Sequence, residues 1–259
     1  MGIKASKYDW IVVTEPYCKP DSPYWLRSLA RYFTDGTDIV LGYCNFSSEG
    51  KDSMFSRHIK ADTLLSYMRS LGQALGKKPY MGIGKNMAYR KEIYREHKGF
   101  SNQLTLLRGE DDLFVNEIAN NNNTKVVVSK DSIMRMPVPK YKRIWKGEKL
   151  SYEVTGNHYK GFGRFVNAIE TWSLILFNLS LIIAICFSII GREWLFTAIA
   201  LIMWLGRFTA AMTVFRKTSK AMGENLCCYF PIFDFMRPLY SLNLKLSYIS
   251  RKKSDFTRK

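Results

Sequence analysis

Three adjacent carboxylates form the most reactive grouping in the sequence. Residues 108–114 read Arg-Gly-Glu-Asp-Asp-Leu-Phe, so Glu110, Asp111 and Asp112 stand side by side. Ionised carboxylates this close repel one another, and at least one of them can hold its proton to a higher pH and serve as a general base. The same acids could instead only stabilise the N-terminus of a helix through its dipole. Both interpretations stay open at the level of sequence.

Two further segments could carry chemistry. Residues 82–90 read Gly-Ile-Gly-Lys-Asn-Met-Ala-Tyr-Arg, and residues 143–149 read Arg-Ile-Trp-Lys-Gly-Glu-Lys. The first could line a binding site, or it could be an ordinary tight turn that enters a helix. The second is basic and precedes a long apolar run, and such a segment is usually only a membrane anchor.

The positions of these groups follow from the elements around them. The apolar run 9–14 ends at Glu15, which is typical of a buried strand whose carboxyl end opens into a loop. Ligands of α/β folds bind beyond such strand ends, so Glu15 is a further candidate. The remaining pattern predicts a helix capped by Ser22 with Pro23 at its first position, a strand at 38–46, a helix at 61–75, a polar turn at 120–123, and strands at 125–128 and 133–136. This alternation predicts an α/β fold.

Two long apolar runs follow. Residues 171–190 carry no charge, and residues 194–215 are interrupted only by Arg207. Twenty apolar residues span about 30 Å as a helix, so two transmembrane helices joined by a tight turn at 191–193 are favoured over a pair of buried core helices. We expect Arg207 to reach the membrane surface with its long side chain, although it could instead face a polar site between the helices.

The charges flanking the two runs predict their orientation. Lysine and arginine are frequent before the first run and after the second, which places both termini in the cytoplasm and the turn outside the inner (cytoplasmic) membrane. The apolar segment 226–242 is broken by prolines and charges, so we expect it to lie on the membrane surface or to be re-entrant. The basic end 251–259 suits an anionic leaflet.

Composition excludes several other classes. The 259 residues carry a formal net charge of +17, with 47% hydrophobic and 24% charged residues, which argues against disorder. The five cysteines and three histidines show no metal-ligand spacing, so a disulfide scaffold, a structural zinc site and a zinc hydrolase are not expected, and a reducing compartment fits. No signal peptide is expected. Much of the basic charge flanks the apolar runs and no recognition motif accompanies it, so we expect no nucleic-acid partner.

In this order, the segments resemble the membrane-bound family 2 glycosyltransferases. That family has an acidic motif at a strand end followed by proline and a Trp-Leu helix, then a GxGxNxAYR segment, a GEDxDL-like segment and a W-x-x-Q-K-x-R-like segment before the membrane helices. Here the corresponding stretches are 14–20 with Trp25-Leu26, then 82–90, 109–114 and 145–151. The resemblance covers nearly the whole chain.

The resemblance implies transfer of a sugar from a nucleotide-sugar donor to a glycan or lipid-linked acceptor of the cell envelope, with inversion. Asp111 would be the general base, and Glu15 would contact Mg²⁺ or Mn²⁺ that offsets the diphosphate charge. The implied substrate-binding residues are Gly82, Gly84, Asn86, Arg90, Glu110, Asp112, Trp145, Glu148 and Lys149. Membrane lipids would be further partners.

The sequence departs from the family in three places. The family's Asp-x-Asp is here Glu15-Pro16-Tyr17, and a tyrosine is a poor replacement for a metal-bridging carboxylate. Glu148 stands at the glutamine position, where an acid should repel a diphosphate, and Ser151 stands at the arginine position. The family's N-terminal third, with its uridine-binding pocket, has no counterpart, which suggests a fragment, an alternative start or a decayed gene product.

The expected fold class is therefore α/β, a partial GT-A-like mixed sheet with flanking helices, followed by two transmembrane helices and an interfacial C-terminal segment. The expected division is a partial glycosyltransferase domain at 1–150, an interfacial helix at 151–170, two transmembrane helices within 171–215 and a cytoplasmic membrane-surface tail at 216–259. The alternative is a catalytically inactive homologue that acts as a membrane-bound binding or assembly subunit. A small two-span membrane adaptor is disfavoured by the three ordered motifs.

Overall fold

The computed structural model describes residues 2–47, 53–97, 99–100, 106–161, 163–251 and 255–256. The elements in chain order are α1 (Gly2–Ala5), β1 (Trp10–Val13), β2 (Lys19–Pro20), α2 (Trp25–Ala30), β3 (Ile39–Gly42), β4 (Cys44–Phe46), α3 (Met54–Leu75), β5 (Met87–Arg90), α4 (Lys91–Glu96), α5 (Glu110–Ile118), β6 (Thr124–Val127), η2 (Lys130–Ser132), β7 (Met134–Met136), α6 (Lys142–Gly156), α7 (Gly163–Ile190), α8 (Trp194–Ala221), η3 (Cys227–Tyr229) and α9 (Phe230–Ile249). The predicted mixed α/β fold is confirmed.

The strands form two mixed sheets. The four-stranded sheet has the order β1-β5-β3-β6, in which β5 runs antiparallel to β1 and β3 while β3 and β6 are parallel. The three-stranded sheet has the order β2-β7-β4. The single strand expected at 38–46 is wrong, because the chain leaves the first sheet after Gly42 and enters the second at Cys44. The Asn86 side chain donates a hydrogen bond of 2.8 Å to the Tyr43 carbonyl at this break.

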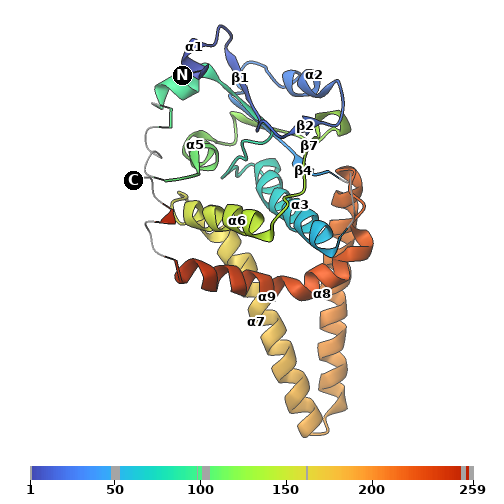
Figure 1. The fold of residues 1–259 in the computed structure, drawn as a ribbon. Coiled ribbons are helices and arrows are strands. Elements are labelled where there is room, and N and C mark those ends of the chain that lie inside the picture. The colour runs from blue at the N-terminus through green and yellow to red at the C-terminus, as the bar shows by residue number, and fades with distance from the viewer. Residues whose placement is uncertain are drawn as a thin grey trace.

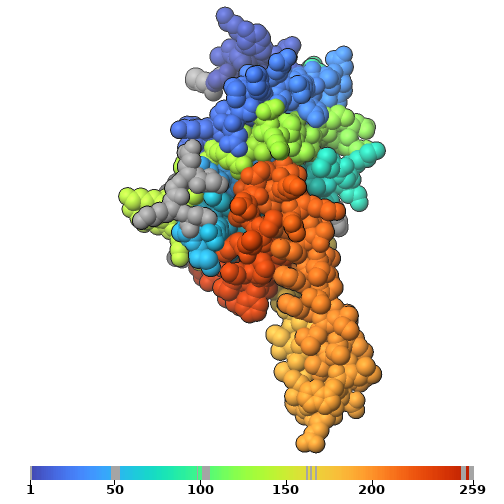
Figure 2. Space-filling view, turned by 90° about the vertical axis from the view of Figure 1, so that its right-hand side faces the viewer, coloured from blue at the N-terminus to red at the C-terminus, as the bar shows by residue number. Residues whose placement is uncertain are grey.

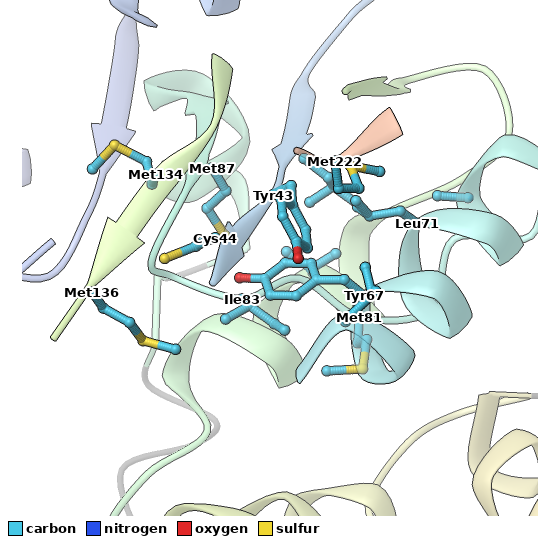
Figure 3. Packing of buried hydrophobic residues seen from close by; sticks show 14 of the residues in the cluster. Tyr43, Cys44, Tyr67, Leu71, Met81, Ile83, Met87, Met134, Met136 and Met222 are labelled. Atoms are coloured by element: carbon cyan, nitrogen blue, oxygen red, sulfur yellow. The ribbon is translucent and has the colours of Figure 1, made fainter. Parts of the chain in front are cut away.

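Successive side chains of β3 belong to two separate apolar clusters. Ile39 and Leu41 belong to the large apolar cluster under α3 and α5, whereas Val40 belongs to a small cluster with Leu29 of α2. Successive strand residues face opposite sides of a sheet, so helices cover both faces of the four-stranded sheet. Methionine and tyrosine side chains fill the larger cluster around Tyr43 and Tyr67 (Figure 3).

Helix starts differ from the sequence prediction at two places. α2 begins at Trp25 rather than at Pro23, and Ser22 accepts a hydrogen bond from the Tyr24 backbone N–H without capping the helix. α3 begins at Met54, well before residue 61, because Ser53 caps it by accepting from the Ser56 N–H at 3.1 Å.

Helices α7 and α8 form a hairpin that projects away from the α/β body (Figure 1; Figure 2). Both are long and apolar enough to span a membrane, over Ala168–Ile190 and Trp194–Ala221. In the most apolar window of each helix only 11% of the residues are buried, so these are not core helices of the body. The interfacial helix expected at 151–170 overlaps two helices, since α6 ends at Gly156 and α7 begins at Gly163.

Helix α9 lies crosswise at the base of the body, where the hairpin emerges (Figure 1). Pro231 occupies its first turn and Pro238 lies inside it, yet the helix is continuous. Six exposed apolar side chains along it form one stripe with helical spacing. This α9 stripe consists of Ile232, Phe235, Leu239, Leu242, Leu246 and Ile249. In the basic end of the chain, residues 252–254 and 257–259 lie outside the described residues.

Arg207 does not reach toward a surface as expected. Its guanidinium forms a two-pronged ion pair with Asp234 of α9, with one contact at 2.8 Å. The expectation failed because Asp234 is 27 residues away along the chain and belongs to a segment whose path the sequence does not reveal. The pair joins α8 to α9 at the base of the hairpin.

Candidate active site

A pocket of about 540 Å³ brings together residues from four parts of the chain. It lies between the loop after β1, the segment before β5, the N-terminus of α5 and one side of α6. The predicted site residues that line it are Glu15, Gly84, Glu110, Asp111, Asp112 and Glu148. Its volume falls in the range of small-molecule sites, about 300–1,000 Å³.

Asp111 is positioned by the backbone of Gly84. The Gly84 N–H donates to the Asp111 carboxylate, and a side chain at Gly84 would place its Cβ 2.8 Å from the same oxygen. Gly109 precedes the helix with φ 116°, a conformation that favours glycine, and this turn directs Glu110 and Asp111 toward the pocket. Burial raises the pKa of Asp111. A carboxylate with raised proton affinity at the edge of a pocket is suited to accept a proton.

Asp112 has a different environment from Asp111. Its side chain is completely buried and accepts hydrogen bonds from the hydroxyls of Thr155 and Tyr159, the latter at 2.8 Å. Burial, and then the neighbouring charge of Asp111, raises the pKa of Asp112 to about 7. Its carboxyl thus links α5 to α6 and to the segment after it, and the expected contact of Asp112 with substrate stays a prediction.

Glu148 pairs with Lys85. Lys85 is buried, and its ammonium contacts the Glu148 carboxylate across the rim of the pocket. Burial by itself would lower the pKa of Lys85, but the charge of Glu148, the hydrogen bond to it and smaller contributions from Tyr17 and Cys44 together outweigh burial, so the pKa of Lys85 is raised. From the sequence we expected the Glu148 acid to repel a diphosphate. Instead it neutralises the cation of the glycine-containing segment.

The loop that holds Glu15 lies against the same segment. The Thr14 hydroxyl donates to the Lys85 carbonyl at 3.1 Å, and both Glu15 and Tyr17 line the pocket. Burial raises the pKa of Tyr17, which keeps the phenol neutral. The described residues contain no group of three or more His, Cys, Asp or Glu side chains that could hold a metal ion. The donor set therefore does not fit a metal held by protein side chains alone.

Three predicted residues support the fold rather than the pocket. Gly82 packs so tightly that an added Cβ would meet Val115 at 2.6 Å. Asn86 is buried, donates to the backbone carbonyls of Tyr43 and Ser132, and accepts from the Trp25 indole. Arg90 ends β5 and donates to the carbonyls of Thr37 and Thr34 at 2.8 and 2.9 Å. The segment at 82–90 thus combines a turn with a strand and does not enter a helix directly.

Trp145 and Lys149 face a different cavity. Lys149 pairs with Asp62 and donates to the Ser66 hydroxyl at 2.9 Å, while Trp145 packs edge-on against Phe55. Both line a second pocket of about 110 Å³, which also contacts α7 and α9. Lys85, Glu148 and Tyr152 line both pockets. The Lys85–Glu148 pair therefore lies between the two cavities.

Sequence reasoning missed several residues of the site. Lys85 carried a signal, since it is the cation that directly follows the second glycine of the segment at 82–90. Tyr152, Thr155 and Tyr159 carried none, because their region was expected to be an interfacial helix outside the catalytic domain.

Comparisons with known proteins are limited to structure. No family model and no curated protein matches the sequence. The chain is similar to a solved mannosyltransferase, PcManGT from Pyrobaculum calidifontis in complex with GDP-Man and Mn²⁺, with 12% identity and a TM-score of 0.48. The match covers 93% of this chain and 65% of that protein, so the chain spans less than two thirds of its length.

Proposed function

We propose that this chain is a membrane-anchored glycosyltransferase of GT-A type, related to family 2, that uses a nucleotide-sugar donor and a glycan or lipid acceptor. The observation that supports this most is Asp111, a carboxylate with raised proton affinity held at a pocket by the Gly84 N–H. Glu15 and Glu148, which belong to two other motifs of the sequence, line the same pocket.

Asp111 has one role in this reaction. The acceptor hydroxyl oxygen bonds to the anomeric carbon of the donor sugar while the bond from that carbon to the diphosphate oxygen breaks. The leaving nucleoside diphosphate keeps the electron pair, and Asp111 takes the hydroxyl proton. Attack from the face opposite the leaving group inverts the anomeric carbon. A divalent cation shared between Glu15 and the donor phosphates would offset the phosphate charge, as Mg²⁺ is commonly held by one or two carboxylates and substrate phosphates.

The membrane arrangement belongs to the same proposal. The two apolar helices span the inner membrane, the body and both termini lie in the cytoplasm, and α9 rests on the membrane surface through its apolar stripe. The body at 1–150 would then act on a donor from the cytoplasm, next to lipid-linked acceptors.

A second candidate is a catalytically inactive subunit that binds or assembles other components. The Lys85–Glu148 pair favours it, because this cation is not free for a diphosphate. Tyr17 favours it as well, since a neutral phenol replaces an expected carboxylate.

A transfer assay separates the two candidates. The purified full chain in lipid nanodiscs is incubated with radiolabelled GDP- and UDP-sugars, Mn²⁺ and a membrane lipid extract, and labelled lipid or glycan is measured. Transfer supports the enzyme. Binding of a nucleotide sugar without transfer supports the inactive subunit, and absence of both contradicts a donor-using protein.

A further inference from the structure

A groove on the other side of α6 has no role in the proposed transfer. It has a volume of about 540 Å³ and lies between α3, α6 and α9. Its lining is Met54, Phe55, His58, Lys142, Arg143, Trp145, Lys146, Tyr229, Ile232, Met236, Tyr240, Asn243 and Leu244. We refer to it as the α6–α9 groove.

The interior of the α6–α9 groove is apolar and aromatic. The His58 and Tyr240 rings lie 4.0 Å apart, and Phe55 packs edge-on against Trp145. Burial lowers the pKa of His58, so its imidazole stays neutral near pH 7. The Trp145 side chain is more than nine-tenths buried, and its indole N–H has no hydrogen-bond partner among the described residues. This interior would suit a ligand with a long apolar chain and a polar group next to it.

One edge of the groove is cationic. Lys142, Arg143 and Lys146 come from the first two turns of α6, and the lining contains no acid to offset them. Lys142 lies over the Phe55 ring at 5.6 Å, Arg143 lies over the Tyr141 ring at 5.3 Å, and Lys146 donates to the Asn243 side chain. Within the described part of the chain none of the three forms an ion pair. The positive end of the helix dipole adds to their charge.

The groove lies beside the surface that would face a membrane. Ile232 lines the groove and also begins the α9 stripe, so the two apolar surfaces are continuous. Helix α9, which carries this stripe, runs along the base of the body from which the α7–α8 hairpin projects (Figure 1). An acyl chain could therefore pass from the stripe into the groove without crossing a polar surface.

We propose that the α6–α9 groove binds one anionic phospholipid. Its phosphate lies against Lys142, Arg143 and Lys146, and part of one acyl chain fills the apolar interior. The charge complementarity selects an anionic headgroup over a zwitterionic one, since a zwitterionic headgroup would add a cation to an already cationic edge. This site is separate from the candidate active site and does not depend on sugar transfer.

Native mass spectrometry of the detergent-purified full chain tests the proposal. Phosphatidylglycerol and phosphatidylcholine with identical acyl chains are titrated into separate samples. We expect one phosphatidylglycerol to remain bound at concentrations where phosphatidylcholine does not, with an apparent affinity at least tenfold higher. Inorganic phosphate in large excess should not displace it, because the acyl chain contributes to binding.

Two charge-reversal variants test whether the cationic edge of the groove selects the lipid. Lys142→Glu/Arg143→Glu alters two exposed residues of the groove edge, and Arg216→Glu/Lys217→Glu makes the same change at exposed positions near the end of α8. Both changes leave buried side chains intact, so folding should be retained and can be checked by circular dichroism. We expect the first protein to lose the selective lipid and the second to keep it.

Three results would overturn the proposal. They are equal binding of the two lipids, equal loss in both variants, and displacement by inorganic phosphate alone. The last would identify a simple anion site instead of a lipid site.

Discussion

The Glu148 carboxylate and the Lys85 ammonium form an ion pair across 63 residues of sequence. The pair forms part of the wall between the candidate active site and the smaller pocket that reaches α7 and α9. In this position Glu148 controls whether Lys85 is available to an anionic ligand. Its effect is therefore to occupy a cation, which differs from the direct repulsion expected from sequence.

Replacing Glu148 by glutamine should strengthen binding of nucleoside diphosphates. The wild-type chain should bind them weakly or not at all, whereas the freed Lys85 gains a charge-assisted hydrogen bond worth about 1.5 kcal/mol, or roughly tenfold in affinity. Isothermal titration with GDP or UDP and Mn²⁺ measures the change. Glu193→Gln, in the turn between α7 and α8, is the matched control. Micromolar binding by the wild type, or no gain in the variant, would contradict this role of the pair.

Asp111→Asn should abolish most of the transfer while leaving donor binding nearly unchanged. The amide keeps the shape of the side chain but cannot take the acceptor proton, and a general base typically contributes about 10²–10⁴-fold. The comparison is turnover against nucleotide affinity in the same preparation. Asp35→Asn, a change at a fully exposed aspartate, serves as control. Turnover close to that of the wild type would remove Asp111 from the mechanism.

Stability should fall as pH rises from about 4 to 7. The folded chain holds a proton on Asp112 up to a pKa of about 7, whereas the unfolded chain has released it above the ordinary value of 3.8. The folded state then binds more protons than the unfolded state across this window, and raising the pH favours unfolding, by an amount on the order of a few kcal/mol. Melting temperatures in detergent at pH 5, 6, 7 and 8 measure the slope. Asp112→Asn should flatten the slope but not remove it, because Asp111 also has a raised pKa. A slope as steep in the variant as in the wild type would show that another group is responsible.

Removing one partner of the Arg207–Asp234 pair should be more damaging than removing both. Asp234 is buried, and Asp234→Ala leaves the Arg207 guanidinium uncompensated between α8 and α9. Losing one partner of a buried pair typically costs about 3–5 kcal/mol. Thermal unfolding in detergent should show that Asp234→Leu/Arg207→Leu recovers much of the loss caused by Asp234→Ala. A double variant as unstable as the single one would contradict the idea that the uncompensated Arg207 charge causes the loss.

Topology can be tested at the turn between the two spans. A reporter fused at Gly191 should lie on the side of the membrane opposite to one fused after residue 251, because the basic flanks retain both ends in the cytoplasm. Alkaline phosphatase and a fluorescent protein at each position give paired signals in cells. The same side for both positions, or release of the chain by carbonate alone, would contradict two spanning helices.

The sequence by itself determined the features that depend on neighbouring residues. Length and lack of charge at 171–190 predict a membrane-length helix, and the apolar run at 9–14 predicts the strand observed as β1. The three acids after Gly109 predict the start of a helix, and α5 begins at Glu110. These predictions succeed because helix and strand periodicity are set within a few residues.

Only the tertiary structure decided which groups meet. Asp111 and Asp112 are adjacent, chemically identical and both part of the pocket lining, yet Asp111 accepts from the Gly84 N–H while Asp112 is fully buried against Thr155 and Tyr159. Helical geometry turns successive side chains by about 100°, so neighbours in sequence face different surroundings whose identity depends on packing. For the same reason, the sequence did not reveal that Arg207 pairs with Asp234. Ion pairs and pockets join segments that are distant in the chain, and no local pattern records which of them will come together.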